Sequence, residues 1–193
     1  MELESARLRL RHWRPEDRRP FAAINSEPAV QRYLAPMTPE GSDAMMARIE
    51  AHFAKHGWGY WALEEKAGGV LVGMCGIMHV PFQAFFTPAV EIGWRLSERW
   101  QGKGLAQEAA RAALTFAFGS LGLDRVVSFT VVTNAASWRL MKRLGMKKAG
   151  EFDNPDMPPG HSLRRNVLYE ICAADFTPDA ATSWRGRETP KSR

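Results

Sequence analysis

Two glycines separated by one residue lie in the segment Gln101-Gly-Lys-Gly-Leu-Ala106, between a predicted strand and a predicted helix. Glycine permits backbone conformations closed to other residues and exposes the backbone of the turn. The first amides of the following helix have no partner within that helix, and the helix dipole adds partial positive charge beside them. These residue types at this spacing predict an anion site suited to a pyrophosphate, to which Lys103 adds a point charge.

The turn differs from two common phosphate-binding motifs. A P-loop has the pattern Gly-x4-Gly-Lys-Ser/Thr, whereas Leu105 follows Gly104 here. The dinucleotide-binding fingerprint needs a third glycine and an acid at the end of the next strand, and neither is present. Taken alone, the turn is also compatible with a tight bend that needs glycine for steric reasons. The helices and strands around the turn are therefore needed to distinguish an anion site from a simple bend.

The hydrophobic pattern predicts the strands and helices that position this turn. Residues 7–11 alternate polar and apolar side chains, and residues 126–132 form a β-branched run typical of a strand buried on both faces. Further strands are predicted at residues 58–64, 70–78, 90–96, 146–152 and 163–171. Helices are predicted at residues 15–25, 28–34, 38–57, 104–119 and 134–144. Because the strands first meander and then alternate with helices, we expect one α/β (α+β) domain with a mixed central sheet of about seven strands, flanked by helices.

Length and composition are those of a single soluble globular domain. The chain has 193 residues, of which 45% are hydrophobic and 24% are charged. No apolar run approaches the roughly 18 residues of a membrane span, and the acidic N-terminus is unlike a secretory signal. We therefore expect a cytoplasmic protein with no membrane partner. We divide the chain into a domain, residues 1–176, and a basic C-terminal tail, residues 177–193, with four basic residues expected outside the core: Arg185, Arg187, Lys191 and Arg193.

Charge, cysteines and histidines say less about function. The net charge of +5 suits a polyanionic ligand, but the chain has no recognisable reading helix or base-stacking motif, so nucleic acid is not expected as a partner. Cys75 and Cys172 lie in apolar stretches, which predicts two buried free thiols. His52 and His56 lie four residues apart on a predicted helix, a spacing that can hold a metal. Without a third ligand nearby, we interpret them as polar residues on a solvated helix face and expect no metal.

Several motifs in order make the glycine turn specific. The segment Gln101–Ala106 matches the Gln/Arg-x-x-Gly-x-Gly/Ala signature of the GNAT acetyltransferase superfamily. Four segments resemble the branch that acetylates ribosomal-protein N-termini (RimJ/RimL-like): Ala6–Arg11, Glu91–Leu96, Leu121–Val126 and Asn134–Met146. The resemblance covers roughly residues 5–176. It implies a GNAT-like fold in which two neighbouring parallel strands splay apart at the cofactor site, and an N-acetyltransferase that uses acetyl-CoA.

The resemblance also implies a role for each residue that matches the family's motifs. Main-chain groups of Trp94, Arg95 and Leu96 would bind the pantetheine arm of acetyl-CoA. Backbone amides would cradle its pyrophosphate at Gln101, Gly102, Lys103, Gly104, Leu105 and Ala106. Asn134 would hydrogen-bond the pantetheine arm, and Ser137 would lie near the sulfur and protonate the departing thiolate. The amine would attack the thioester directly, so catalysis would consist mostly of positioning and proton transfer.

Glu91 is our candidate for the general base that deprotonates the attacking ammonium, because related enzymes use an acid on this strand. In a regular strand Glu91 shares a face with Gly93 and Arg95, whereas a bulge would shift this register by one residue. Two alternatives stay open. In one, Glu91 pairs with a nearby arginine, and in the other it orients the substrate.

The candidates for the general acid have structural explanations as well. Asn134 is a good N-cap, and Ser137 lies three residues later in the first turn of the same predicted helix. Many relatives use a tyrosine as the acid, and the chain has three, namely Tyr33, Tyr60 and Tyr169. We rank Tyr60, a predicted strand residue, and Tyr33, a candidate for the wall of the acceptor pocket, below Ser137.

The identity of the acetyl acceptor is left open by the sequence. A primary amine is implied, and resemblance to the branch favours a protein N-terminus, while aminoglycosides and polyamines are acetylated on similar scaffolds. A non-catalytic acyl-CoA sensor or a ribosome-associated binding module is the alternative that the basic tail and net charge suggest. We expect helices near residues 25–57 and the loop 154–161 to form the acceptor pocket. A homodimer is compatible with the branch, but nothing in the sequence fixes it.

Overall fold

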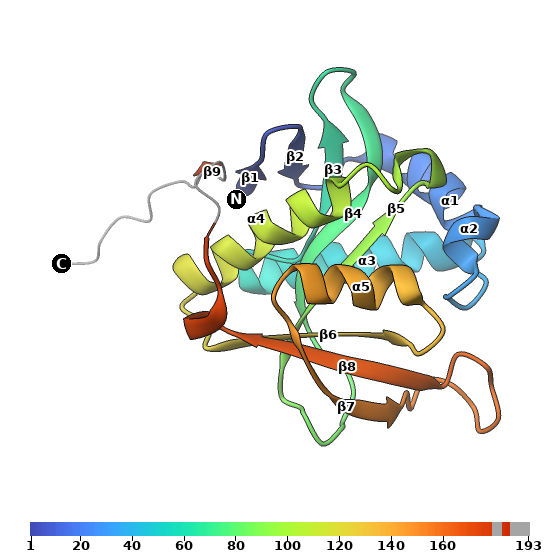
Figure 1. Ribbon diagram of the computed structural model, residues 1–193. Coiled ribbons are helices and arrows are strands. Elements are labelled where there is room, and N and C mark those ends of the chain that lie inside the picture. The colour runs from blue at the N-terminus through green and yellow to red at the C-terminus, as the bar shows by residue number, and fades with distance from the viewer. Residues whose placement is uncertain (179–182, 186–193) are drawn as a thin grey trace.

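The computed structural model describes residues 1–178 and 183–185. Within them, a nine-stranded sheet has the order β7-β8-β6-β5-β4-β3-β2-β1-β9 (Figure 1). The strands are β1 Glu2–Glu4, β2 Leu8–Arg11, β3 Tyr60–Glu65, β4 Val70–His79, β5 Val90–Leu96, β6 Arg125–Val131, β7 Lys147–Asp153, β8 Arg165–Cys172 and β9 Ser183–Arg185. Neighbouring strands are antiparallel except for β5 and β6, which are parallel. The expected mixed sheet is confirmed.

Helices flank this sheet (Figure 1). They are α1 Arg18–Ser26, α2 Pro28–Gln31, α3 Pro39–His56, α4 Leu105–Gly119 and α5 Ala135–Arg143, and short 3-10 turns occur at Pro15–Asp17, Glu98–Trp100 and Ala173–Asp175. α4 packs on β4 and β5, α5 on β6 and β8, and α1 on α3. Small residues such as Ala109 and Ala113 are fully buried on α4, which lets its backbone approach the sheet closely.

The ends of α3 follow from local chemistry. The Thr38 hydroxyl accepts a hydrogen bond from the amide of Gly41 at 3.1 Å, as an N-cap does, and Pro39 occupies the first helical position. Gly57 ends the helix in a left-handed conformation, with φ of 80°. This helix is the long element that forms a wall of the cavity described below, so its bounds fix that wall.

All seven predicted strands are present, and two strands of three residues each extend the sheet at one edge. β1 pairs with β2 on one side and with β9 on the other, where Leu3 lies opposite Trp184. β9 falls within the tail expected at residues 177–193, so part of that stretch adds to the sheet through its backbone. Arg187, Lys191 and Arg193 lie outside the described residues.

The two cysteines differ in environment. Cys75 lies fully buried on β4, where burial raises the pKa of its thiol. Cys172, the last residue of β8, is exposed, so the prediction of two buried thiols is wrong for this residue. An apolar neighbourhood in sequence does not fix the burial of a residue at a strand end. In the described part of the chain, no helix has the length and apolar character that a membrane span requires.

The parallel pair β5–β6 opens the sheet where the site lies. β4 and β5 stay in register along the whole of β5, from Leu96 opposite Gly73 to Val90 opposite His79. β5 and β6, by contrast, are paired at Glu91 and Val127, and no further register pair joins the two strands. From Glu91 toward Leu96 the backbone of β5 therefore leaves its parallel neighbour. The expected splay of two parallel strands is confirmed.

Candidate active site

A cavity of about 1030 Å³ occupies the opening between β5 and β6. One end is lined by the glycine turn and the first turn of α4, and by side chains of α5. The other end is lined by apolar residues of α2, α3 and the segment between them, namely Val30, Leu34, Met45 and Ile49. Asn154 and Asp156 of the loop after β7 also line the cavity. The helices and loop predicted to form the acceptor pocket therefore do line a single cavity with the glycine turn.

The glycine turn has the backbone geometry that the sequence predicted. Gly102 and Gly104 have φ of 71° and 79°, in the left-handed region that favours glycine. A Cβ atom built on Gly102 would meet nothing within 4 Å, so the turn borders open space. Gly104 is the N-cap of α4, and no side chain caps this helix. The first amides of α4 are therefore available to an anion at the end of the cavity.

Two side chains of the turn are engaged by neighbouring groups of the protein. Gln101 donates its side-chain N–H to the carbonyl of Leu96 at 2.9 Å, which ties the turn to the end of β5. The ammonium of Lys103 lies 4.9 Å from the centre of the Trp100 ring, and Lys103 is not among the residues that line the cavity. The backbone, rather than these side chains, is what the turn offers to an anion.

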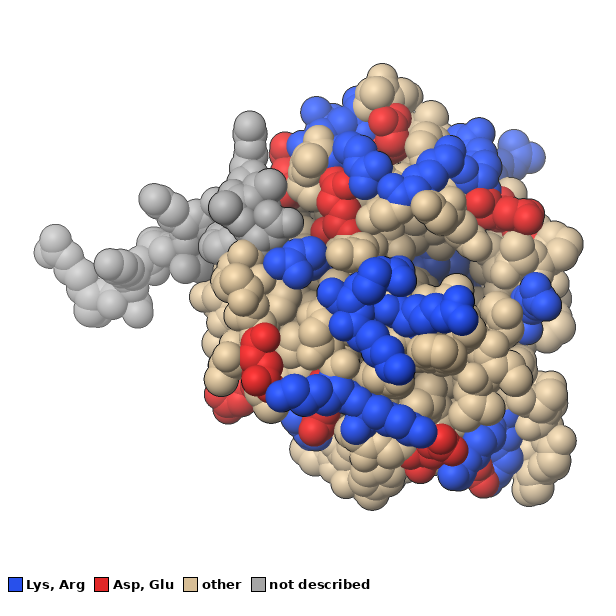
Figure 2. Space-filling view, in the orientation of Figure 1, with Lys and Arg blue, Asp and Glu red and all other residues tan. Residues whose placement is uncertain are grey.

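Arginines of α5 supply the positive charge that Lys103 does not. Arg139 and Arg143 both line the cavity, and Arg143 donates to the side-chain oxygen of Gln107 on α4 at 3.1 Å. Figure 2 shows Lys and Arg side chains gathered over α5 on the face in view. Neither arginine was predicted as a site residue from the sequence. Their spacing of four residues, on a helix that begins at a predicted site residue, was the available signal.

Glu91 lies on the cavity wall, at the point where β5 and β6 part. Its carboxylate accepts a hydrogen bond from the hydroxyl of Tyr60 at 2.9 Å. Burial raises the pKa of Glu91 to about 7, against the lowering effect of that hydrogen bond. Burial, followed by the nearby Glu91 charge, raises the pKa of Tyr60 well above its usual value, so the hydroxyl stays protonated and donates. Glu91 thus pairs with a tyrosine rather than an arginine in the described part of the chain.

Gly93 makes the contact between Tyr60 and Glu91 possible. The regular register of β5 places Glu91, Gly93 and Arg95 on one face, as predicted. A Cβ atom on Gly93 would lie 2.8 Å from the Tyr60 oxygen, which is closer than real Cβ contacts come. From the sequence, Tyr60 was ranked below Ser137 as a predicted strand residue, and nothing in the spacing of residues 60 and 91 indicates that the two side chains meet.

Arg95 lies next along the same face, and its side chain points toward α1 and α3. One terminal nitrogen donates to the side-chain oxygen of Asn25 and approaches the sulfur of Met45 at 3.5 Å. Its buried Nε has no hydrogen-bond partner among the described residues, and burial lowers the pKa of the guanidinium to about 10. Trp94, Arg95 and Leu96 all line the cavity. Arg95 therefore leaves one donor unused in a dry part of the site.

Asn134 and Ser137 line the cavity from the start of α5. The Asn134 side-chain oxygen accepts from the amide of Ser137 at 3.3 Å, and its nitrogen donates to the Thr130 hydroxyl at 3.0 Å. The capping role considered for Asn134 is therefore present. Ser137 is half-buried beside it. The roles of both residues toward the cofactor stay predictions.

Comparisons with known proteins agree on one family. Residues 7–147 match the family described as Acetyltransferase (GNAT) domain. FsC-acetyl coenzyme A-N(2)-transacetylase of Aspergillus fumigatus is 30% identical over 186 residues, which cover 90% of this chain and 77% of that protein. The ribosomal protein uS5-alanine N-acetyltransferase of Escherichia coli is 26% identical over 140 residues, which cover 72% of this chain and 71% of that protein. In fold, the chain resembles a GNAT-family acetyltransferase from Bacillus anthracis with a TM-score of 0.74 and 23% identity, over 90% of this chain and 99% of that one.

Proposed function

The chain belongs to the GNAT acetyltransferase family and is an N-acetyltransferase, and on this premise we propose that it acetylates the N-terminal amine of a protein or peptide, with Glu91 as general base. The observation that carries the proposal is the position of Glu91. Its partly buried carboxylate lines one cavity together with the glycine turn and the apolar residues of α2 and α3. A donor bound at the first end and an amine bound at the second would meet beside it.

The residues at the first end fit acetyl-CoA, which would supply the activated acetyl group as a thioester. The free amides at residues 102–106 and the charges of Arg139 and Arg143 would hold the pyrophosphate. Main-chain groups of residues 94–96 that face the gap left by β6 would hold the amides of the pantetheine arm. The carbonyl of Leu96 already accepts a hydrogen bond from Gln101, so Leu96 would bind the pantetheine arm through its other main-chain groups.

Glu91 would remove the proton of the incoming ammonium. A general base works best when its pKa is near the pH of the reaction, and burial brings the pKa of Glu91 to about 7. The Tyr60 hydroxyl holds the carboxylate in place and stabilises its charged form. Ser137 would donate a proton to the departing thiolate from the opposite wall of the cavity. Tyr60 is less suited to that task, because its hydroxyl already serves Glu91.

The charges around the cavity support a peptide acceptor over a polycationic one. Among the described residues that line it, the carboxylates are Glu91 and Asp156, whereas four arginines are present: Arg48, Arg95, Arg139 and Arg143. Because Arg139 and Arg143 would face the pyrophosphate, Arg48 and Arg95 remain against the two carboxylates, and a polyamine or an aminoglycoside would find no excess of negative charge for its several positive charges. A peptide N-terminus carries a single charge, and a small first side chain would fit the apolar walls.

A small-molecule amine is the second candidate for the acceptor. It is favoured by the relative from Aspergillus fumigatus, whose name is FsC-acetyl coenzyme A-N(2)-transacetylase and whose alignment covers 90% of this chain. We expect peptides with a free N-terminus to be turned over, with release of free thiol, at least tenfold more efficiently in kcat/KM than lysine-containing peptides with a blocked N-terminus, spermidine or kanamycin. Preferred turnover of a small amine would replace the peptide proposal with the second candidate. The absence of turnover on every amine of a wide panel would contradict both.

The hydrogen bond between Tyr60 and Glu91 predicts a pH effect. Because a base must be unprotonated, kcat/KM should rise with pH and level off above an apparent pKa near 7. The Tyr60 hydroxyl favours the charged carboxylate and so lowers the pKa of Glu91. In Tyr60→Phe this stabilisation is lost, and the rise in kcat/KM should move to higher pH. Tyr33→Phe, which removes a hydroxyl elsewhere on the cavity wall, should leave the apparent pKa in place.

The comparison of these two variants distinguishes titration of Glu91 from titration of the acceptor amine. Ionisation of the substrate amine also makes the rate rise with pH, but that pKa belongs to the substrate and does not depend on Tyr60. A pH profile of kcat/KM that is the same in Tyr60→Phe and in the unchanged protein would therefore exclude Glu91 as the titrating base.

A further inference from the structure

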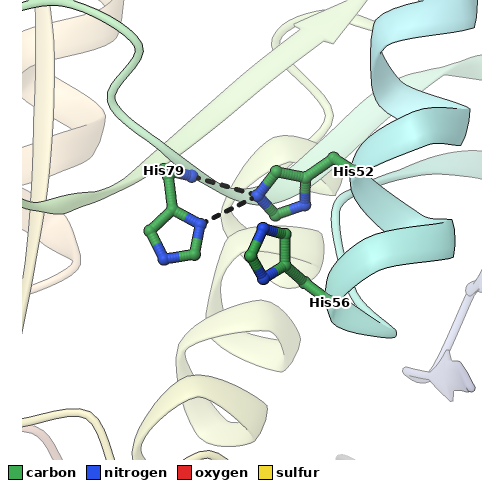
Figure 3. A group of neighbouring side chains, drawn as sticks. All are labelled: His52, His56 and His79. Carbon is green, nitrogen blue, oxygen red and sulfur yellow. Dashed lines mark hydrogen bonds between the residues drawn. The ribbon is translucent and has the colours of Figure 1, made fainter.

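Three histidines from two elements meet at the end of α3 (Figure 3). His52 and His56 lie four residues apart on the last turns of α3, and His79 is the final residue of β4. Each offers one ring nitrogen, and these three nitrogens lie within 4.8 Å of one another. From the sequence, we expected no third ligand near His52 and His56. That expectation is wrong, because β4 brings His79 to them from 23 residues farther along the chain.

The hydrogen bonds of His52 fix which of its nitrogens can bind a ligand. Its Nδ1 lies 2.7 Å from the carbonyl oxygen of Trp58, and because a carbonyl oxygen only accepts, Nδ1 carries the proton. Its Nε2 accepts from the backbone amide of His79 at 3.3 Å. The ring is therefore neutral, and the lone pair of Nε2 faces His79, where a bound ion would take the place of this hydrogen bond. Histidines that bind metals usually donate their other N–H to a carbonyl or carboxylate in this way.

The spacing of the nitrogens is close to that of ligands on one ion. Nε2 of His52 and Nδ1 of His79 are 3.1 Å apart. Two nitrogens bound to one tetrahedral Zn²⁺ at about 2.05 Å lie about 3.3 Å from each other. His56 completes the group, with ring centroids 4.5 Å from His52 and 4.6 Å from His79. Trp58 packs against all three rings, at centroid distances between 4.7 and 5.6 Å, and so limits their movement.

We propose that His52, His56 and His79 bind one divalent transition-metal ion, with Zn²⁺ as the ion that their chemistry fits best. Neutral imidazoles are good ligands for Zn²⁺, Ni²⁺ and Cu²⁺ and poor ligands for Mg²⁺ and Ca²⁺. Three protein ligands leave one position of a tetrahedral ion for water or another small ligand. Without an ion, Nδ1 of His79 donates a hydrogen bond to Nε2 of His52, and a bound cation would take the place of that hydrogen bond.

The ion would join two walls of the cavity. α3 carries Met45, Arg48 and Ile49 of the acceptor end, and His79 lines the same cavity from β4. Coordination by residues of both elements fixes the C-terminal end of α3 against the end of β4. The three histidines have no part in the proposed binding of acetyl-CoA or in proton transfer by Glu91, so binding of the metal is measurable without acetyl-CoA or an acceptor.

Metal binding can be tested on the full chain after treatment with a chelator and dialysis. Titration with ZnCl₂ should give one ion per chain by calorimetry and should raise the melting temperature with ZnCl₂ concentration. Co²⁺ should bind in its place and give the visible absorption bands typical of nitrogen ligands. His79→Gln and His56→Gln, which change residues near the surface and spare the His52 bond to Trp58, should each weaken Zn²⁺ binding by about 10- to 100-fold.

The matched control is His161→Gln, which removes an exposed histidine from the loop after β7. It should bind Zn²⁺ like the unchanged protein. The proposal is overturned if the unchanged protein binds no Zn²⁺ stoichiometrically. It is also overturned if His79→Gln and His56→Gln keep the affinity of His161→Gln while their melting temperatures show that they are folded.

Discussion

Replacement of Glu91 by Gln is expected to lower kcat by about 100- to 10,000-fold, the range that a lost general base typically costs. The amide cannot take a proton from the incoming ammonium, so the reaction depends on the small fraction of amine that is already neutral. Gln still accepts a hydrogen bond from Tyr60 and has the same shape, so the fold and the cavity should persist. Thiol release under saturating acetyl-CoA and acceptor measures kcat.

Two controls accompany the Glu91 variant. Its dissociation constant for acetyl-CoA, measured by calorimetry, should equal that of the unchanged protein, because Glu91 lies away from the glycine turn. Glu151→Gln makes the same chemical change at an exposed ion pair on β7 and should keep the full rate. An unchanged kcat in Glu91→Gln would remove the base role. Glu91 would then be a residue that orients the substrate.

A negative charge at Gly102 is expected to weaken acetyl-CoA binding by about 10- to 100-fold. The comparison is between Gly102→Asp and Gly102→Asn, which differ by one charge. Asn and Asp tolerate the left-handed conformation better than other residues with side chains. A Cβ at this position meets nothing within 4 Å. Like charges about 5 Å apart repel by roughly 3 kcal/mol at an effective dielectric constant of about 20, and salt reduces this repulsion.

The Asn variant is the control for backbone strain in this experiment. Any strain of a side chain at φ of 71° affects both variants, so the ratio of their dissociation constants isolates the charge. The ratio should shrink as the ionic strength rises. Equal affinities of the two variants at low salt would mean that the pyrophosphate binds away from this turn. A large loss in the Asn variant alone would indicate instead that the backbone conformation is critical.

The parts of the fold that rest on long periodic patterns could be predicted from the sequence. The helix predicted at residues 104–119 is present as α4, and Ala109 and Ala113 on it are buried. The glycines at 102 and 104 indicated positive φ, which the turn has. β1 and β9 could not be predicted, because strands of three residues are too short to show a period, and their pairing joins opposite ends of the chain.

The parts of the site that depend on long-range pairing were missed. Glu91 was predicted as a site residue, but Tyr60 was not linked to it, since the contact requires β3, β4 and β5 in register and a glycine at 93. The contact between His79 and His52 was not predicted for the same reason. The end of β4 meets the end of α3 only in the folded chain. The spacing of residues in the sequence predicts contacts within one helix or strand. It does not predict contacts between residues that the sheet brings together.

A crystal structure of the chain with acetyl-CoA tests the central claim most directly. We expect pyrophosphate oxygens within hydrogen-bonding distance of backbone amides at residues 102–106, and the thioester in the gap between β5 and β6, on the side of Glu91. The acetyl carbon should then lie where an amine held beside the Glu91 carboxylate can reach it. A pyrophosphate bound elsewhere, or a thioester on the far side of β5 from Glu91, would contradict the account.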